Sequence, residues 1–165
     1  MSSFYDGPMN IVPATEVDVP LILELIRGLA EYEKLSHIVV ATEDRLRESL
    51  FGPIPAAEVL LAYEDSECAG FAIFFPVYST FQAQKGIYLE DLFVRPHLRG
   101  RGIGRALLAR VARIAIERGC GRVEWGVLAW NQPSIEFYKK LGAVPMDEWT
   151  KYRLDGEALA KLALI

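Results

Sequence analysis

The chain alternates short apolar runs of strand length with longer segments of helical periodicity. Apolar residues recur every three to four positions in residues 15–32 and 105–118, which predicts two amphipathic helices. A shorter helix is predicted over residues 42–51, where a run of Gly and Pro ends the pattern. The runs rich in aromatic and β-branched residues, which predict strands, are residues 10–14, 58–63, 69–78, 87–94, 123–130 and 149–154.

The order of these elements predicts one α/β domain over residues 1–165. Three successive strands in the middle should form an antiparallel meander. Pro133 near the start and Gly142 at the end mark a further helix, and residues 157–162 a terminal helical turn or two. No repeat, low-complexity tract or linker interrupts the chain. We therefore expect a mixed, mostly antiparallel sheet flanked by helices.

Composition and charge restrict the classes of function. Hydrophobic residues make up 52% of the chain and charged residues 24%, as in a globular protein with a sizeable core. The formal net charge of −4 argues against a general binder of nucleic acid or anionic membranes. Residues 1–50 carry nine acids and four bases, whereas residues 95–122 carry eight arginines and one acid. Such segments suit a cleft that takes a polyanion at one end and a cation at the other.

Cysteine usage and hydropathy give expectations about metals and location. Cys68 and Cys120 lie far apart without neighbouring histidines, so neither a disulfide scaffold nor a zinc site is supported, and no metal is expected. No apolar run approaches the ~20 residues that cross a bilayer. Residues 1–10 lack the basic flank and hydrophobic stretch of a targeting segment. We expect a cytoplasmic protein with no membrane partner.

The most informative segment is the loop between the strand at 87–94 and the helix at 105–118. Glycines at a helix N-terminus let a ligand approach the backbone, where free N–H groups and the helix dipole favour negative charge. Arg99, Arg101 and Arg105 add cationic donors, so a pyrophosphate would fit, although Gly-x-Gly is also common in structural loops. The loop is not a Walker motif, and Leu107 stands where a dinucleotide fingerprint needs its third glycine.

The strand, the Arg-x-x-Gly-x-Gly loop and the following helix resemble the acetyl-coenzyme A site of the GCN5-related N-acetyltransferase (GNAT) superfamily. Four segments resemble its spermidine/spermine and thialysine acetyltransferase subfamily: Ala30–Ser36, Tyr88–Asp91, Trp130–Ser134 and Phe137–Ala143. The resemblance covers roughly residues 9–163. It implies the GNAT fold with a splayed strand, acetyl-CoA as co-substrate, and a homodimer whose acceptor channel draws on both subunits.

The resemblance also implies a cofactor site around the loop. Backbone groups of Phe93 and Val94 pair with the pantetheine arm, the loop holds the pyrophosphate, and two residues after the last strand contact the arm. The implied cofactor-binding residues are Phe93, Val94, Arg99, Gly100, Arg101, Gly102, Ile103, Gly104, Arg105, Asn131 and Ser134.

Two residues align with the family's catalytic groups. Tyr138 matches the general acid near the coenzyme sulfur, and Glu90 matches the acid that takes up the amine proton. The chemistry requires both roles, because an alkylammonium of pKa ~10.4 must lose a proton before it attacks, and the leaving thiolate must gain one. Tyr138 could instead be a core aromatic. Glu90 and Asp91 are adjacent on a strand and should point to opposite faces, so one of them could be structural.

The acceptor site is implied to hold acidic and aromatic side chains. Glu33 matches an acidic position of the subfamily, Phe81 lies near an acceptor-site tryptophan, and Trp149 matches a late aromatic. Asp91 completes the implied substrate-binding set. The acid that polyamine-specific members carry before their tryptophan is absent from Tyr78–Phe81. This departure favours a small amine, a diamine or a lysine-like amino acid over spermidine or spermine.

We therefore predict an acetyl-CoA-dependent N-acetyltransferase. Its acceptor is a primary amine of a small cation, namely a diamine, a polyamine or a thialysine- or lysine-like amino acid, which attacks in a ternary complex. The alternatives are a protein, peptide or aminoglycoside N-acetyltransferase and a non-catalytic acyl-CoA sensor, which the presence of Glu90 and Tyr138 disfavours. Nucleic-acid binding by residues 95–122 is disfavoured because aromatics are not interleaved with the arginines.

Overall fold

The computed structural model describes residues 9–165. The chain divides between Gly126 and Val127 into two compact units, and each is described by itself. The prediction of one domain over residues 1–165 stays a prediction. The predicted lack of a targeting segment concerns residues 1–10, of which residues 1–8 lie outside the described part.

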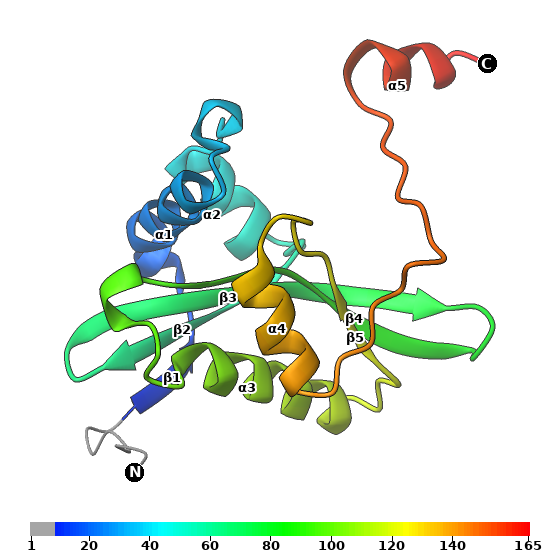
Figure 1. Cartoon of the computed structure of the whole chain (residues 1–165). Coiled ribbons are helices and arrows are strands. Elements are labelled where there is room, and N and C mark those ends of the chain that lie inside the picture. Colours follow the sequence, from blue (N-terminus) through cyan, green and yellow to red (C-terminus); the bar gives the residue numbers. More distant parts are fainter. Residues whose placement is uncertain (1–8) are drawn as a thin grey trace. The chain divides into compact units, whose positions relative to one another are not determined.

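The first unit is built on a five-stranded sheet with the order β1-β2-β3-β4-β5 (Figure 1). The strands are β1 (Met9–Pro13), β2 (Glu58–Glu64), β3 (Glu67–Ser79), β4 (Gln84–Val94) and β5 (Val123–Trp125). The first four strands pair antiparallel with their neighbours, and β5 runs parallel to β4. The predicted meander and the mixed, mostly antiparallel sheet are confirmed.

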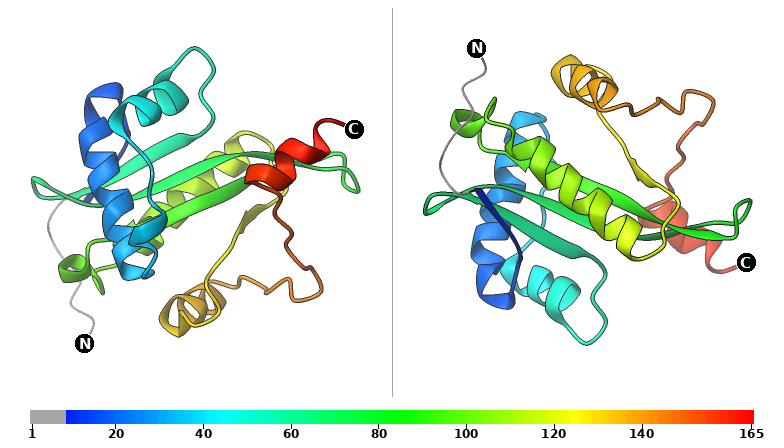
Figure 2. Two further views of the ribbon diagram at one scale, coloured as in Figure 1. Left: turned by 90° about the horizontal axis from the view of Figure 1, so that it is seen from above. Right: turned by 90° about the horizontal axis from the view of Figure 1, so that it is seen from below.

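Helices cover both faces of this sheet (Figure 2). The helices of the first unit are α1 (Val19–Tyr32), α2 (Glu43–Phe51) and α3 (Ile103–Glu117), with single 3₁₀ turns η1 (Glu16–Asp18), η2 (Ser36–Ile38) and η3 (Pro96–Leu98). Helices α1 and α2 lie on one face and α3 on the other. Ile22 and Leu25 of α1 pack in one core cluster with Phe71, Ile73 and Phe93 of the sheet.

The end of β4 is packed closely against its neighbours, which matters because the predicted cofactor loop begins there. A Cβ on Gly28 of α1 would lie 3.1 Å from the ring of Phe93. A Cβ on Gly70 of β3 would meet the carbonyl oxygen of Phe93 at 2.2 Å. Both glycines therefore permit a close approach that any side chain would prevent. The last residues of β4 are fixed between a helix and a strand.

The second unit, Val127–Ile165, contains α4 (Gln132–Lys140) and α5 (Gly156–Leu162). Asn131 caps α4, since its side-chain oxygen accepts a hydrogen bond from Ser134 N at 3.3 Å. Gly142 follows the helix with φ +86°, a conformation that favours glycine. Both helices predicted for this part of the sequence are confirmed.

Two predicted strands are corrected. The strand expected over residues 123–130 ends at Trp125, because β5 pairs with β4 only opposite Ile87–Leu89. The strand expected over residues 149–154 does not form in the described chain, and Tyr152 within it is 91% exposed. Aromatic and β-branched residues favour a strand only where a neighbouring strand supplies its hydrogen bonds, and the local pattern does not report whether one exists.

Candidate active site

The glycine-rich loop connects β4 to α3 and leaves open space in front of the helix N-terminus. Gly100 and Gly102 have φ values of +77° and +84°, in the left-handed region that favours glycine. Gly102 is the N-cap of α3, and a Cβ built on either glycine would meet no atom within 4 Å. The first N–H groups of α3 therefore lack helical acceptors and stand beside unfilled space, which fits a phosphate group. Gly104 is similar, because a Cβ there would meet only Val94 Cγ2, at 3.7 Å.

The three arginines of this loop have different surroundings. The Arg99 guanidinium stacks 4.2 Å from the ring centroid of Tyr32, and its Nε donates to Val94 O at 2.9 Å. Arg101 Nη1 lies 2.7 Å from Oε2 of Glu64 in a mostly buried ion pair. Arg105 is exposed, and no hydrogen bond or ion pair of its side chain is found within residues 9–165. Only Arg105 has a side chain that no contact of this kind holds in place.

Among the described residues, the end of β4 next to this loop has an edge without a neighbouring strand. Arg95 N donates to Ala69 O at 2.8 Å, and Phe93 lies opposite Phe71. Because donors alternate along an antiparallel ladder, the N–H of Phe93 points to β3 and that of Val94 points to the opposite edge. Strand β5 pairs with β4 only opposite Ile87–Leu89. The N–H of Val94 therefore faces the side where β4 and β5 are no longer paired, which is the expected splay.

An acidic cluster formed by Glu33, Glu90 and Asp91 lies at β4 and the end of α1. Burial, and then the negative charges of Glu90 and Glu33, raise the pKa of Asp91 from 3.8 to about 7. Partial burial also raises the pKa of Glu33. The electrostatic influence of Glu90 and Glu33 on Asp91 places the three carboxyl groups in one neighbourhood, where a cation would relieve their repulsion.

Residues 84–94 do not form the regular strand from which opposite faces were expected for Glu90 and Asp91, although the directions of the two side chains stay a prediction. Ile73 pairs with Asp91 and the next residue, Phe74, pairs with Leu89, so Glu90 is the extra residue of a β-bulge. A bulge interrupts the two-residue alternation on which that expectation rested. Glu90 is exposed and Asp91 half-buried, and each affects the electrostatics of the other.

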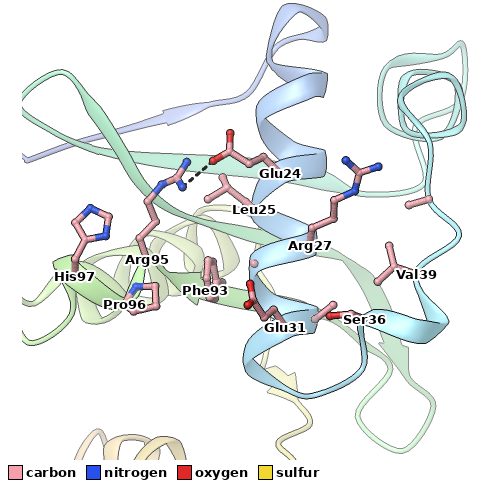
Figure 3. A pocket seen from close by; sticks show the side chains of 13 residues that line it. Glu24, Leu25, Arg27, Glu31, Ser36, Val39, Phe93, Arg95, Pro96 and His97 are labelled. Atoms are coloured by element: carbon pink, nitrogen blue, oxygen red, sulfur yellow. Dashed lines mark ion pairs between the residues drawn. The ribbon is translucent and has the colours of Figure 1, made fainter.

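A cavity of about 710 Å³ lies between α1 and the segment that follows β4 (Figure 3). Arg95 points toward Glu24 in this view and forms an ion pair of 2.8 Å with it. Glu31, Arg27 and His97 also line the cavity, which therefore carries both signs of charge. None of the predicted acceptor residues lines it, and Phe93 is the predicted cofactor residue that does.

Phe81 lies apart from the acidic cluster. It occupies the turn between β3 and β4 and is 94% exposed. Glu90 is six residues beyond the start of β4 at Gln84, a distance of about 20 Å along an extended strand. Within one chain the structure therefore does not bring Phe81 to Glu90 and Asp91.

The remaining predicted residues belong to the second unit. Asn131 is 5% exposed and caps α4, whose first turn contains Ser134. Tyr138 lies on α4, half-buried, with its ring centroid 5.2 Å from that of Phe137. Trp149 follows in an irregular segment and is 71% exposed. The proximity of these residues to the loop of the first unit stays a prediction.

Sequence reasoning missed the residues that hold Arg99 and Arg101. Tyr32 stacks on Arg99 across 67 positions of sequence, and Glu64 pairs with Arg101 across 37. Tyr32 lies in the segment Ala30–Ser36, in which no role was predicted for it, and Glu64 belongs to no predicted motif. These contacts join the end of α1 and the end of β2 to the loop. They could have been predicted only if it were known that these distant segments lie side by side.

Among residues 9–165 no group of three or more His, Cys, Asp or Glu side chains could hold a metal ion. Over the same residues, none of the helices is both long enough and apolar enough to span a bilayer.

Comparison with known proteins decides the family. The sequence model described as the Acetyltransferase (GNAT) family matches residues 26–143, more than half of the chain. The chain belongs to the GNAT family. The thialysine N-epsilon-acetyltransferase of Sus scrofa is 40% identical over 161 residues, covering 91% of this chain and 94% of that protein. The L-ornithine N5-acetyltransferase of Arabidopsis thaliana is 36% identical, covering 88% and 84%.

A solved structure has a similar fold. An integron cassette protein from the mobile metagenome of V. cholerae superposes with a TM-score of 0.77 at 29% identity, covering 94% of this chain and 97% of that one. The predicted family, GNAT fold and N-acetyltransferase activity are confirmed, and so is acetyl-CoA as the acetyl donor. The open glycine cradle at the start of α3 fits the pyrophosphate of that donor.

Proposed function

We propose that this GNAT enzyme acetylates a primary amine of a small cationic acceptor in a ternary complex with acetyl-CoA. The observation that carries the proposal is the acidic cluster of Glu33, Glu90 and Asp91. Two of its members belong to β4, the strand that leads directly into the glycine-rich loop. A cationic acceptor held by this cluster would lie beside the strand whose end offers backbone groups to the donor.

The acceptor class follows from the cluster together with the relatives. The curated relatives are named for thialysine and for L-ornithine, which are both diamino acids. An acceptor with one amine to acetylate and a second cationic group suits three neighbouring carboxyl groups. We therefore place a diamino acid or an aliphatic diamine first among the acceptors, and spermidine or spermine after them.

Asp91 and Glu90 are proposed to share the removal of the amine proton. A general base works best with a pKa near the working pH. Asp91 meets this condition with a pKa of about 7, whereas the exposed Glu90 can relay the proton through water. The amine nitrogen then attacks the thioester carbonyl carbon, the nitrogen–carbon bond forms, and the proton leaves to the carboxylate pair.

The developing negative charges need donors of their own. The N–H of Val94 faces the unpaired edge of β4 and is proposed to donate to the oxyanion. When the carbon–sulfur bond breaks, we propose that Tyr138 gives its phenolic proton to the sulfur. Asn131 and Ser134 are proposed to contact the pantetheine arm. Within the chain, the side-chain oxygen of Asn131 also accepts a hydrogen bond from Ser134 N, which fixes the side chain at the start of α4.

We propose that the residues of the loop and of the first turn of α3 have different roles in binding the pyrophosphate. The backbone from Gly100 to Gly104 supplies N–H donors, and Arg105 supplies a cation. Arg99 and Arg101 already have partners within the chain, so we propose that they act mainly by shaping the loop.

A homodimer and a cytoplasmic location complete the proposal. The subfamily resemblance supports the dimer, and so does the placement of Phe81 about 20 Å from the acidic cluster along β4, because an exposed aromatic at that distance could act as an acceptor-site residue only for another subunit. Trp149 is proposed as a second acceptor-site aromatic. A cytoplasmic location is also proposed, and no nucleic-acid or membrane partner is proposed.

The proposal is tested by release of the coenzyme thiol at saturating acetyl-CoA across a panel of acceptors. The panel contains thialysine, L-ornithine, aliphatic diamines, spermidine, a lysine peptide and an aminoglycoside, and mass spectrometry identifies each product. We expect the highest kcat/KM with a diamino acid or a diamine. Turnover confined to the peptide or the aminoglycoside would overturn the proposal, and so would no acceptor-dependent release from an enzyme that binds coenzyme A by calorimetry.

A further inference from the structure

The basic residues that precede α3 are each held by a partner from another part of the first unit. Arg95 pairs with Glu24 of α1 at 2.8 Å, and His97 Nε2 lies 2.9 Å from Glu67 of β3. Arg99 stacks on Tyr32, and Arg101 pairs with Glu64 at the end of β2. These contacts connect the loop to α1 on one side and to the β2–β3 hairpin on the other.

The contact between Arg101 and Glu64 differs from the others by its burial. The Glu64 side chain is only 8% exposed, and Arg101 is 30% exposed, whereas Glu67 is 52% exposed. A buried carboxylate without a cationic partner is strongly unfavourable, so Glu64 requires Arg101 to stay where it is. Arg101 lies between Gly100 and Gly102, the two loop residues with positive φ. Fixing its side chain therefore fixes the backbone on both sides.

We propose that Glu64 is a positioning residue for the cofactor loop, which it holds in its pyrophosphate-binding conformation through Arg101. This inference rests on the proposed role of the loop. It assigns to Arg101 a task within the protein rather than a direct bond to the cofactor. The loop glycines alone are free to adopt many conformations, and the ion pair selects the one in which the N–H groups of α3 stand beside open space.

The first test measures the affinity for coenzyme A by calorimetry in Glu64→Leu, Arg101→Leu and the double variant. If the pair acts as one clamp, each single change should weaken binding by about tenfold or more, since a small displacement of binding groups has effects of this size. The double variant should bind no more weakly than the worse single variant, because the interaction is lost only once. Independent, multiplying losses would show that Arg101 binds the cofactor itself and would overturn the proposal.

Controls separate positioning from general damage. Glu58→Leu makes the same change on the same strand, β2, at an exposed ion pair with Arg118 beyond the C-terminal end of α3, and it should leave coenzyme A affinity within about twofold of wild type. Glu64→Gln keeps a hydrogen-bond acceptor for Arg101 and should recover most of the affinity lost in Glu64→Leu. Equal losses in Glu58→Leu and Glu64→Leu, or no recovery in Glu64→Gln, would contradict the assignment.

A second readout uses a donor that lacks the pyrophosphate. S-acetylpantetheine carries the same thioester but gives the loop no phosphate to bind. Glu64→Leu should lower kcat/KM for acetyl-CoA about tenfold and leave that for S-acetylpantetheine little changed. An equal fall for both donors would mean that the fold is damaged and would overturn the proposal. If Gly104→Asp keeps full affinity for coenzyme A, the loop does not bind the pyrophosphate and the proposed role of the loop is wrong. If Gly104→Asp loses affinity and Glu64→Leu does not, the loop binds the pyrophosphate but Glu64 does not position it.

Discussion

Asp91→Asn tests whether the acidic cluster stores electrostatic free energy in the folded protein. The side chain of Asp91 is half-buried, and its pKa rises from 3.8 to about 7 through burial and then through the charges of Glu90 and Glu33. In the unfolded chain the pKa returns to its ordinary value, so the folded protein holds a proton that the unfolded protein has released. Asparagine has nearly the same shape and no proton to lose.

The sign and size of the effect follow from this difference in proton binding. Between pH 4 and 7 the folded state binds more protons at Asp91, so stability falls as the pH rises. The full difference between 3.8 and about 7 corresponds to about 4 kcal/mol, present at low pH and lost above the folded pKa. Over the window from pH 5 to 7 the loss is about 2 kcal/mol. Other groups titrate in the same range, so the comparison is with the variant.

The assay is urea unfolding followed by circular dichroism at several pH values from 5 to 8. The difference in unfolding free energy between wild type and Asp91→Asn should change by about 2 kcal/mol from pH 5 to 7, with the wild type losing stability relative to the variant. Asp65→Asn is the matched control, because Asp65 is exposed in the β2–β3 turn with φ +55°, which asparagine also tolerates.

Two results would refute this reasoning. A constant difference between wild type and Asp91→Asn across the pH range would mean that Asp91 keeps an ordinary pKa. A wild type that gains stability relative to the variant as the pH rises would mean that a cation, rather than burial and like charges, governs Asp91. The control should show a flat difference in either case.

Three further predictions concern the donor, the acid and the base. Gly104→Asp should raise the KM for acetyl-CoA far more than the KM for the amine, because the added carboxylate stands in the open space beside Val94, and equal effects on both constants would contradict the loop assignment. Tyr138→Phe should lower kcat by about 10- to 10⁴-fold while the KM for acetyl-CoA and the melting temperature persist, and near-normal turnover would make Tyr138 a packing residue. Glu90→Gln should lower kcat at neutral pH, with partial recovery as the pH rises. It should also shift the acidic limb of the pH–rate profile to lower pH, because one of the charges that raise the pKa of Asp91 is gone. An unchanged profile would exclude Glu90 from proton transfer.

The sequence predicted most of the first unit because local patterns determine its elements. The end of α1 and both ends of α2 agree with the amphipathic pattern, whereas α1 begins at Val19 rather than near residue 15, because residues 16–18 form the 3₁₀ turn η1. Thr42 caps α2 as a threonine in that position should. The loop was identified from its glycines, and two of them adopt positive φ values that explain why glycine is needed. Features that depend on a single chain segment could therefore be predicted from the sequence.

Features that depend on pairing between distant segments could not be predicted from the sequence. The bulge at Glu90 results from the register of β4 against β3, which no local pattern shows. The strand expected at residues 149–154 lacked a partner, and the contact between Glu64 and Arg101 joins residues 37 positions apart. The elevated pKa of Asp91 depends on burial and on two other carboxyl groups, one of them on another element.

We propose that the acidic cluster receives a cationic acceptor, and a ratio of two kcat/KM values tests this proposal. The measurement is kcat/KM for 1,5-diaminopentane divided by kcat/KM for pentylamine, at saturating acetyl-CoA, in wild type and in Glu33→Gln. The two amines share a chain length and differ in the second ammonium. We expect wild type to favour the diamine at least tenfold, and Glu33→Gln to lose much of that preference through a higher amine KM, since a charge-assisted contact contributes roughly 1 kcal/mol or more. A wild type without preference for the diamine, or a preference that Glu33→Gln leaves intact, would mean that the acidic cluster does not bind the second ammonium group.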